Sequence, residues 1–316
     1  MRNLDVRMIS ICVVTVFFIG FTAEAGTTNW YSPVSVSNIS GHAYANPANG
    51  GPTHTPICIT WYCGNDAVDE SISWAVGDFS GYYPASPLTQ YQRGIDNTWY
   101  GSCAVQMKDD YAGFQLHGYS ASQPPNLDLR SMYYQYNFTA QDQLYPWGQG
   151  GYFRYSAYIQ VPAKYFQGSG ACGYFDFIMH LTDTSTGNGV WIVVAAYDSR
   201  GSSALYEGAS WDSGTNTAMV VSYFGSGRRY LTLGDSSYSF TGTTWSGLRY
   251  YAYKMYGQDV TDWATDLNNT YGTNFSTTPS HYRLNGFNLG PEIYVPSGTN
   301  GWMSCSLRDV HLLSNY

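Results

Sequence analysis

Apolar and polar residues alternate along several stretches in the second half of the chain. The apolar positions of the two clearest stretches are Phe153, Tyr155, Ala157, Ile159 and Val161, and then Phe175, Phe177, Met179 and Leu181. Successive side chains of a β-strand point to opposite faces, so this period of two predicts half-buried strands at 152–161 and 174–181. Pro162 has no N–H to donate to a sheet and is expected to end the first strand.

Further strands follow with turns rich in Gly, Asn and Ser between them. Gly187-Asn188-Gly189 is expected to turn the chain into 190–197, an apolar run that suits a strand covered on both faces. The remaining segments are predicted as strands at 218–224, 229–233, 245–256, 287–295 and 305–313, and as one short helix at 260–269. Regular strands of this kind predict an all-β, two-sheet antiparallel sandwich.

The domain organisation is expected to be simple. Residues 26–125 are rich in Gly, Pro, Asn and Ser and predict short strands joined by long loops, whereas 126–316 carry the clearer strand pattern. No internal repeat and no clear linker separates the two portions. We therefore expect a single β-sandwich domain over 26–316, with 26–125 as its loop-rich N-terminal portion.

The first 25 residues have the features of a secretory signal peptide. Arg2 and Arg7 are followed by an apolar run from Met8 to Phe21, and Ala23-Glu24-Ala25 is a small-x-small cleavage site. The run is shorter than the roughly 20 apolar residues that span a bilayer, and nothing later in the chain is apolar enough to do so. The sequence thus predicts export to the extracellular space without a membrane span.

Composition narrows the choice of partner. Aromatic residues make up 17% of the chain and include 31 tyrosines, which is typical of a folded protein because aromatic side chains bury large areas. The net charge is −8 with only three lysines, and such a surface repels phosphate backbones, so nucleic acid is not an expected partner.

Five cysteines remain after the signal peptide, at 58, 63, 103, 172 and 305. In an exported protein they are expected to form disulfides, with one cysteine left over. Cys58 and Cys63 enclose four residues and could close a small loop. No pair of cysteines has the spacing of a zinc site, and neither a metal nor another cofactor is expected for the reaction.

The strand segments 152–161, 174–180, 287–294 and 307–312 resemble those of concanavalin-like jelly-roll sandwiches, which include secreted lectins, glucanases and polysaccharide lyases. The closing strands, with Gly290-Pro291-Glu292 and then Asp309-Val310, are similar to fungal jelly-roll proteins related to glucuronan lyases. Gln115-Leu116-His117 and 253–258 resemble two signatures of the alginate-lyase family, although no Arg-x-Glu-Leu stretch precedes Gln115. The resemblance implies a jelly roll and an extracellular polysaccharide as the partner.

Polar residues between the apolar positions define a candidate glycan-binding face. With Phe153 and Phe175 in the core, the residues expected together on one face of a sheet are Arg154, Tyr158, Gln160, Asp176 and His180, joined by Asn288, Glu292 and Tyr294. Aromatic rings stack on sugars, and planar polar groups bind hydroxyls. The alternative is a solvated sheet face with no ligand.

Two catalytic chemistries suit these residues. A glycoside hydrolase needs two carboxyl groups, for which Asp176 and Glu292 are the candidates. A polysaccharide lyase needs a base, for which His180 is a candidate, and a cation such as Arg154 to neutralise a uronate carboxylate. Tyr158, Gln160, Asn288 and Tyr294 are then expected to bind the substrate.

The leading hypothesis is thus a secreted polysaccharide-degrading enzyme, either lyase or hydrolase. A lectin-like carbohydrate-binding protein and a Tyr-rich structural or adhesive exoprotein are the alternatives. Asp183, Asp198 and Asp309 near strand ends are candidates for a structural calcium site, since calcium prefers oxygen ligands.

Overall fold

The computed structural model describes residues 27–31, 38–40, 42–44, 58–63, 66–67, 73–76, 101–108, 111–118, 129–138, 144–148, 151–234 and 236–315. The expected signal peptide, 1–25, lies outside the described residues. Within them, no helix is long and apolar enough to cross a membrane.

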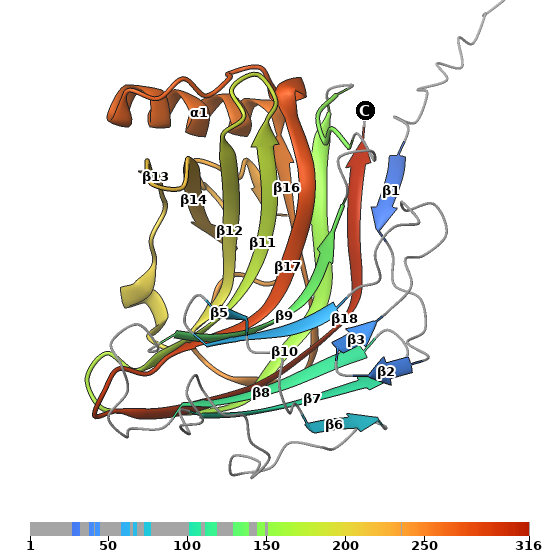
Figure 1. Cartoon of the computed structure of the whole chain (residues 1–316), viewed down its shortest axis with the longest axis vertical. Coiled ribbons are helices and arrows are strands. Elements are labelled where there is room, and N and C mark those ends of the chain that lie inside the picture. Colours follow the sequence, from blue (N-terminus) through green and yellow to red (C-terminus); the bar gives the residue numbers. More distant parts are fainter. Residues whose placement is uncertain are drawn as a thin grey trace, which may run out of the picture.

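Two eight-stranded, mainly antiparallel sheets form a jelly-roll sandwich (Figure 1). The first, which we call the β10 sheet, has the order β15 (Leu233–Gly234), β16 (Trp245–Tyr256), β10 (Tyr152–Gln167), β18 (Asn300–Asn315), β8 (Tyr111–Gly118), β7 (Gly101–Lys108) and β6 (Ser73–Val76), with β1 (Thr27–Tyr31) also paired to β18. The second, the β11 sheet, has the order β13 (Gly208–Asp212), β14 (Thr217–Tyr223), β12 (Gly189–Asp198), β11 (Cys172–Asp183), β17 (Tyr282–Tyr294), β9 (Leu129–Asn137), β4 (Cys58–Cys63) and β5 (Asp66–Ala67).

Smaller elements accompany the two sheets. A short ribbon pairs β2 (Asn38–Ser40) with β3 (His42–Tyr44). The helix α1 (Gly257–Tyr271) covers the predicted segment 260–269 and lies across one end of the sandwich, where its buried side packs against β13 and β16 (Figure 1). Gly272 ends α1 in the left-handed conformation with a φ of 66°, which glycine adopts without strain.

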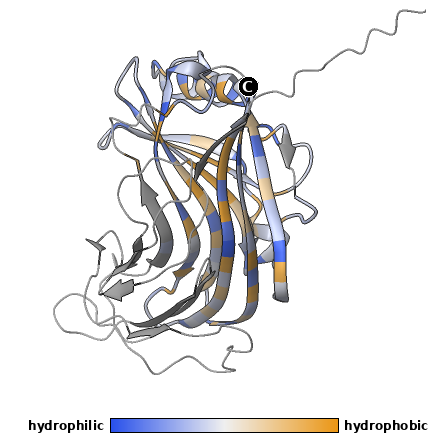
Figure 2. Cartoon of the chain, turned by 90° about the vertical axis from the view of Figure 1, so that its right-hand side faces the viewer, coloured by the Kyte–Doolittle hydropathy of each residue, from blue (hydrophilic) through white to orange (hydrophobic). Residues whose placement is uncertain are grey.

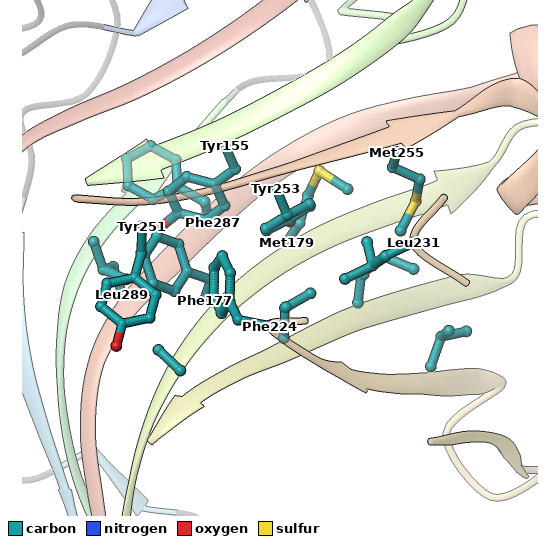
Figure 3. Packing of buried hydrophobic residues seen from close by; sticks show 14 of the residues in the cluster. Tyr155, Phe177, Met179, Phe224, Leu231, Tyr251, Tyr253, Met255, Phe287 and Leu289 are labelled. Atoms are coloured by element: carbon teal, nitrogen blue, oxygen red, sulfur yellow. The ribbon is translucent and has the colours of Figure 1, made fainter. Parts of the chain in front are cut away.

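Aromatic side chains from both sheets meet in the core. Tyr155 of β10 packs edge-on against Phe177 of β11 and Phe287 of β17, with ring centroids 5.0 and 5.5 Å apart (Figure 3). The Tyr155 hydroxyl donates a hydrogen bond to the backbone carbonyl of Asn288 across the sandwich, at 3.2 Å. The predicted inward positions of 152–161 and 174–181 are confirmed, and Figure 2 shows the matching alternation of hydropathy along the strands.

Strand β10 does not end at Pro162 as predicted. It continues to Gln167, and its register with β18 shifts by one residue between Gln160 and Ala163. Pro162 lies in this β-bulge, where the ladder is interrupted and a missing N–H costs little.

Two further strand predictions are wrong. Strand β12 is covered on one face only, because Val190, Ile192 and Val194 are buried whereas Trp191 is 43% exposed. Of 229–233, only Leu233 lies in a strand, because the backbone N–H groups of Arg229 and Tyr230 donate instead to the carboxylate of Glu207.

The cysteines also differ from expectation. Cys172 and Cys305 are buried free thiols. Cys58 and Cys63 are the two ends of the extended strand β4, so their Cα atoms lie about 16 Å apart. A disulfide needs Cα atoms within about 7 Å, so the predicted small loop does not close.

We expect Phe177→Ala to lower the free energy of unfolding by about 3–5 kcal/mol, since Phe177 is fully buried and its ring contacts Tyr155, Phe224 and Tyr253. Denaturant unfolding followed by fluorescence measures the change. Tyr165→Ala is the control, because Tyr165 is 45% exposed, and its change should stay within about 0.5 kcal/mol. Equal losses in the two variants would contradict this account of the core.

Candidate active site

Five of the residues predicted from sequence share the side of the β11 sheet that faces away from the core, which we call its outer face. Asp176 and His180 alternate with the buried residues of β11, and Asn288, Glu292 and Tyr294 alternate with those of β17. The two strands are antiparallel neighbours, so these side chains form one continuous surface.

Arg154, Tyr158 and Gln160 are not part of this surface. They lie on β10, on the opposite side of the sandwich, so the prediction of one shared face is wrong for these three residues. Alternation along a strand separates inward from outward positions, but it does not say to which sheet the strand belongs.

Each of these three residues contacts other members of the β10 sheet. The Arg154 guanidinium donates to the hydroxyl of Tyr250, whose ring lies 5.1 Å from that of Tyr158. Gln160 donates to the Ser306 hydroxyl at 2.7 Å and accepts from the Gly247 N–H at 2.9 Å. Gln160 thereby links β18 to the start of β16.

The segments that resemble alginate-lyase signatures also lie in the β10 sheet. Gln115 and His117 belong to β8, and Tyr253 and Lys254 to β16. Tyr253 is fully buried in the core, so its hydroxyl cannot reach a polysaccharide. These segments therefore contribute nothing to the outer face of the β11 sheet.

Asp176 and Glu292 form a pair of carboxyl groups on the outer face. Asp176 lies opposite Gly290, and Glu292 lies opposite Tyr174, which makes the two acids diagonal neighbours on adjacent strands, about 7–8 Å apart between backbones. Asp176 is 7% exposed and Glu292 is half-buried. The Tyr133 hydroxyl, from β9, donates a hydrogen bond to Glu292 Oε1.

The surroundings of this pair raise the pKa of both carboxyl groups. Burial raises the pKa of Asp176 well above its ordinary value, and the negative charges of Glu292 and then Asp198 raise it further. Burial also raises the pKa of Glu292, while the Tyr133 hydrogen bond acts in the opposite direction. Two partly buried carboxylates this close repel each other, so the pair is expected to lose its last proton at a higher pH than ordinary carboxyl groups do.

A second cluster borders the pair at the end of β12. Asp198 lies opposite Tyr174 and is bound by the Arg200 guanidinium, with Nη2–Oδ2 and Nε–Oδ1 distances of 2.6 and 3.0 Å. The guanidinium carbon of Arg200 lies 5.2 Å from the centre of the Tyr174 ring. The Tyr174 hydroxyl is 2.9 Å from Cys172 Sγ. Arg200 thus neutralises the charge of Asp198, and its guanidinium lies over the ring of Tyr174.

The sequence did not select Tyr133 as a site residue, and it indicated Asp198 only as a candidate calcium ligand. Tyr133 reaches the site through pairing between strands far apart in the sequence, since the Tyr133–Glu292 contact spans 159 positions. Asp198 lies on β12, the strand that directly follows β11 in the chain. The only local signal was the double tyrosine at 133–134, which places a ring on each face of its strand.

His180 lies on the outer face but does not contact the acid pair. Four residues separate it from Asp176 along β11, a distance of about 13 Å. Its ring stacks on Trp191 of β12, with centroids 5.0 Å apart and planes 23° apart. Burial lowers the pKa of His180 to about 4, so the imidazole is neutral at ordinary pH.

The three candidate calcium ligands do not come together. Asp183 accepts hydrogen bonds from Ser185 and Ser276, Asp198 is paired with Arg200, and Asp309 lies 3.2 Å from Arg308. Across the part of the chain that the structure describes, no group of three or more His, Cys, Asp or Glu side chains could hold a metal ion.

Comparisons with known proteins return structural similarity only. No protein-family model matches the sequence, and no curated protein matches it. A family 12 xyloglucanase from Bacillus licheniformis is 10% identical with a TM-score of 0.37, covering 69% of this chain and 88% of its own. Endoglucanase 3 from Trichoderma harzianum, of family 12, is 10% identical with a TM-score of 0.33, covering 69% and 86%. At these values the similarity does not assign the chain to a family.

We expect Asp176→Asn to remove a pH-dependent loss of stability. The unfolded carboxyl ionises at about pH 4, whereas the folded one, with its raised pKa, holds the proton longer, so native stability falls as pH rises above about 4. Thermal melts between pH 4 and 8 should show the variant gaining stability over the native chain as pH rises.

The control for this measurement is Asp212→Asn. Hydrogen bonds from Thr215 and the Gly214 N–H lower the pKa of Asp212, so the stability that it adds is present at neutral pH and is lost on acidification. The two variants should therefore show opposite signs. A constant offset for Asp176→Asn at all pH values would contradict the burial of its charge.

Proposed function

We propose that this chain is a secreted glycoside hydrolase that cleaves a neutral polysaccharide, with Asp176 and Glu292 as its two catalytic carboxyl groups. The observation that carries the proposal is the pair itself. Two partly buried acids on adjacent strands share an outward-facing surface, and burial raises the pKa of both. Glycoside hydrolysis requires one protonated and one ionised carboxyl on either side of the scissile bond.

The reaction follows from those two states. The protonated carboxyl donates its proton to the glycosidic oxygen as the bond to the anomeric carbon breaks. The ionised carboxylate either attacks that carbon or removes a proton from the attacking water. Water supplies OH to the anomeric carbon, and its remaining proton returns the pair to its starting state. The leaving chain departs as an alcohol.

The outer face also favours a neutral substrate over a uronate. Among strands β11, β12, β13, β14 and β17, Arg283 is the only Lys or Arg, and its partner Thr182 lies six residues beyond Asp176, about 20 Å along β11. On β9, Arg130 pairs with Ile293, a core-facing position of β17. Arg200 is already bound to Asp198. A lyase needs a cation beside the uronate carboxylate, and Arg154 lies on the other sheet.

A polysaccharide panel tests the type of reaction. The mature chain should release new reducing ends from neutral β-glucans or xylans, without the ultraviolet absorbance of the unsaturated products that a lyase makes. Absorbing products would replace the hydrolase with a lyase. Binding without any product would replace it with a lectin, and neither binding nor product would leave the structural-protein alternative.

Substitution of the pair tests the catalytic assignment. Asp176→Asn and Glu292→Gln should each lower kcat by about 10²–10⁴-fold, the usual contribution of a catalytic carboxyl. Added azide should restore activity to the variant that lacks a nucleophile, and aryl glycosides with good leaving groups should restore it to the variant that lacks the acid.

Asp262→Asn is the matched control for these two variants. Asp262 lies on the exposed side of α1, where it accepts a hydrogen bond from Gln258, so its substitution should leave kcat unchanged. Full activity in either Asp176→Asn or Glu292→Gln would show that the carboxyl concerned has no catalytic role.

A further inference from the structure

A strip of the outer face runs along β11 and β17 from the acid pair to β12. Asn288 lies opposite Ile178, one pleat beyond Asp176, and His180 lies opposite Trp191, one pleat further. The strip therefore begins beside the carboxyl pair and ends at an exposed indole about 13 Å away along the strand.

Trp191 is unusually exposed for a large aromatic residue in the interior of a sheet. It is 43% exposed although it belongs to a central strand of the sheet, and Met219, its register partner on β14, is 40% exposed. The neutral His180 ring stacks against the indole and holds it over the sheet. An exposed aromatic surface supported in this way fits the apolar face of a sugar ring.

Two polar atoms within the strip have no hydrogen-bond partner among the residues that the structure describes. They are Asn288 Oδ1 and His180 Nε2, both inaccessible to solvent. Asn288 is only 7% exposed, so its bare oxygen is a costly feature for a folded protein to keep. Both residues keep part of their surface exposed, so rotation of the amide or of the imidazole would present these atoms to the hydroxyl groups of a sugar, which both donate and accept.

We propose that Trp191, His180 and Asn288 form a sugar-binding subsite beside the acid pair, with Trp191 as a stacking platform and the other two as hydroxyl partners. This inference rests on the proposed hydrolase function and deepens it, because it gives the direction in which one arm of the substrate leaves the carboxyl pair. Trp191 then contacts a sugar unit remote from the bond that is cut.

Chain-length dependence tests the platform. Trp191→Ala should lower kcat/KM on the polysaccharide and on long oligosaccharides by about 10-fold or more, and change it less than about 2-fold on a short aryl glycoside, which does not reach the platform. Trp191→Tyr should restore most of the loss. Tyr165→Ala, which removes an equally exposed ring from the β10 sheet, should have no effect. Equal losses on short and long substrates would overturn the subsite.

Asn288→Ala tests the hydroxyl partner. The Tyr155 hydroxyl binds the backbone oxygen of Asn288 and not its side chain, so that contact survives the substitution. The variant should raise KM for the polysaccharide about 3–10-fold with a melting temperature that is unchanged or higher, since Oδ1 has no partner to lose and its burial is costly. A lower melting temperature with an unchanged KM would assign Asn288 a structural role instead.

Failure of the hydrolase proposal can be separated from failure of the subsite. If the chain releases no product, electrophoresis through gels that contain β-glucan or xylan still reports binding. Retardation that is lost in Trp191→Ala and kept in Tyr165→Ala would support the subsite without catalysis. Retardation of all three proteins alike, or of none, would overturn it.

Discussion

The packing of Tyr155 against Phe177 and Phe287 is the constraint on which the rest of the molecule depends. These rings hold the two sheets together, and in doing so they decide which side chains of β10, β11 and β17 point inward. Because successive residues of a strand alternate, fixing Phe177 inward also fixes Asp176 outward. The outer face of the β11 sheet is therefore a consequence of the core, and the carboxyl pair is held by residues that never touch it.

Much of the fold could be predicted from the sequence because its signal is local. The alternation along β10 and β11 and the bounds of β16 follow from neighbouring residues alone. The misjudged segments depended on contacts that the local pattern does not contain. Pro162 is tolerated because it lies in a bulge of β10, where the ladder with β18 is interrupted. The apolar run of β12 leaves Trp191 exposed because none of the described residues packs over it closely enough to bury it.

The residues of the candidate site divide in the same way, into those that a local pattern predicts and those that depend on contacts between strands. Asp176, His180, Asn288, Glu292 and Tyr294 could be grouped in advance because they lie on two strands that happen to be neighbours. Arg154 has the same outward parity but belongs to the other sheet, and no property of its own segment says so. Tyr133 was missed because it enters through register between distant strands, and Asp198 was assigned to a calcium site and not to the surroundings of the acid pair. Asp198 carries its own neutralising partner, Arg200, which acts as a local counterion beside the pair.

Strands β17 and β18 follow every other strand in the sequence, yet each lies in the interior of its sheet. β18 joins β10 to β8, and β17 joins β11 to β9. Neither sheet can close until these last segments have left the ribosome, and contacts of such long sequence separation form slowly. During synthesis the earlier strands keep unpaired edges, and chains in this state are prone to aggregation. Glu292 lies on β17, one of these two last strands, so the acid pair forms only in the final stage of folding.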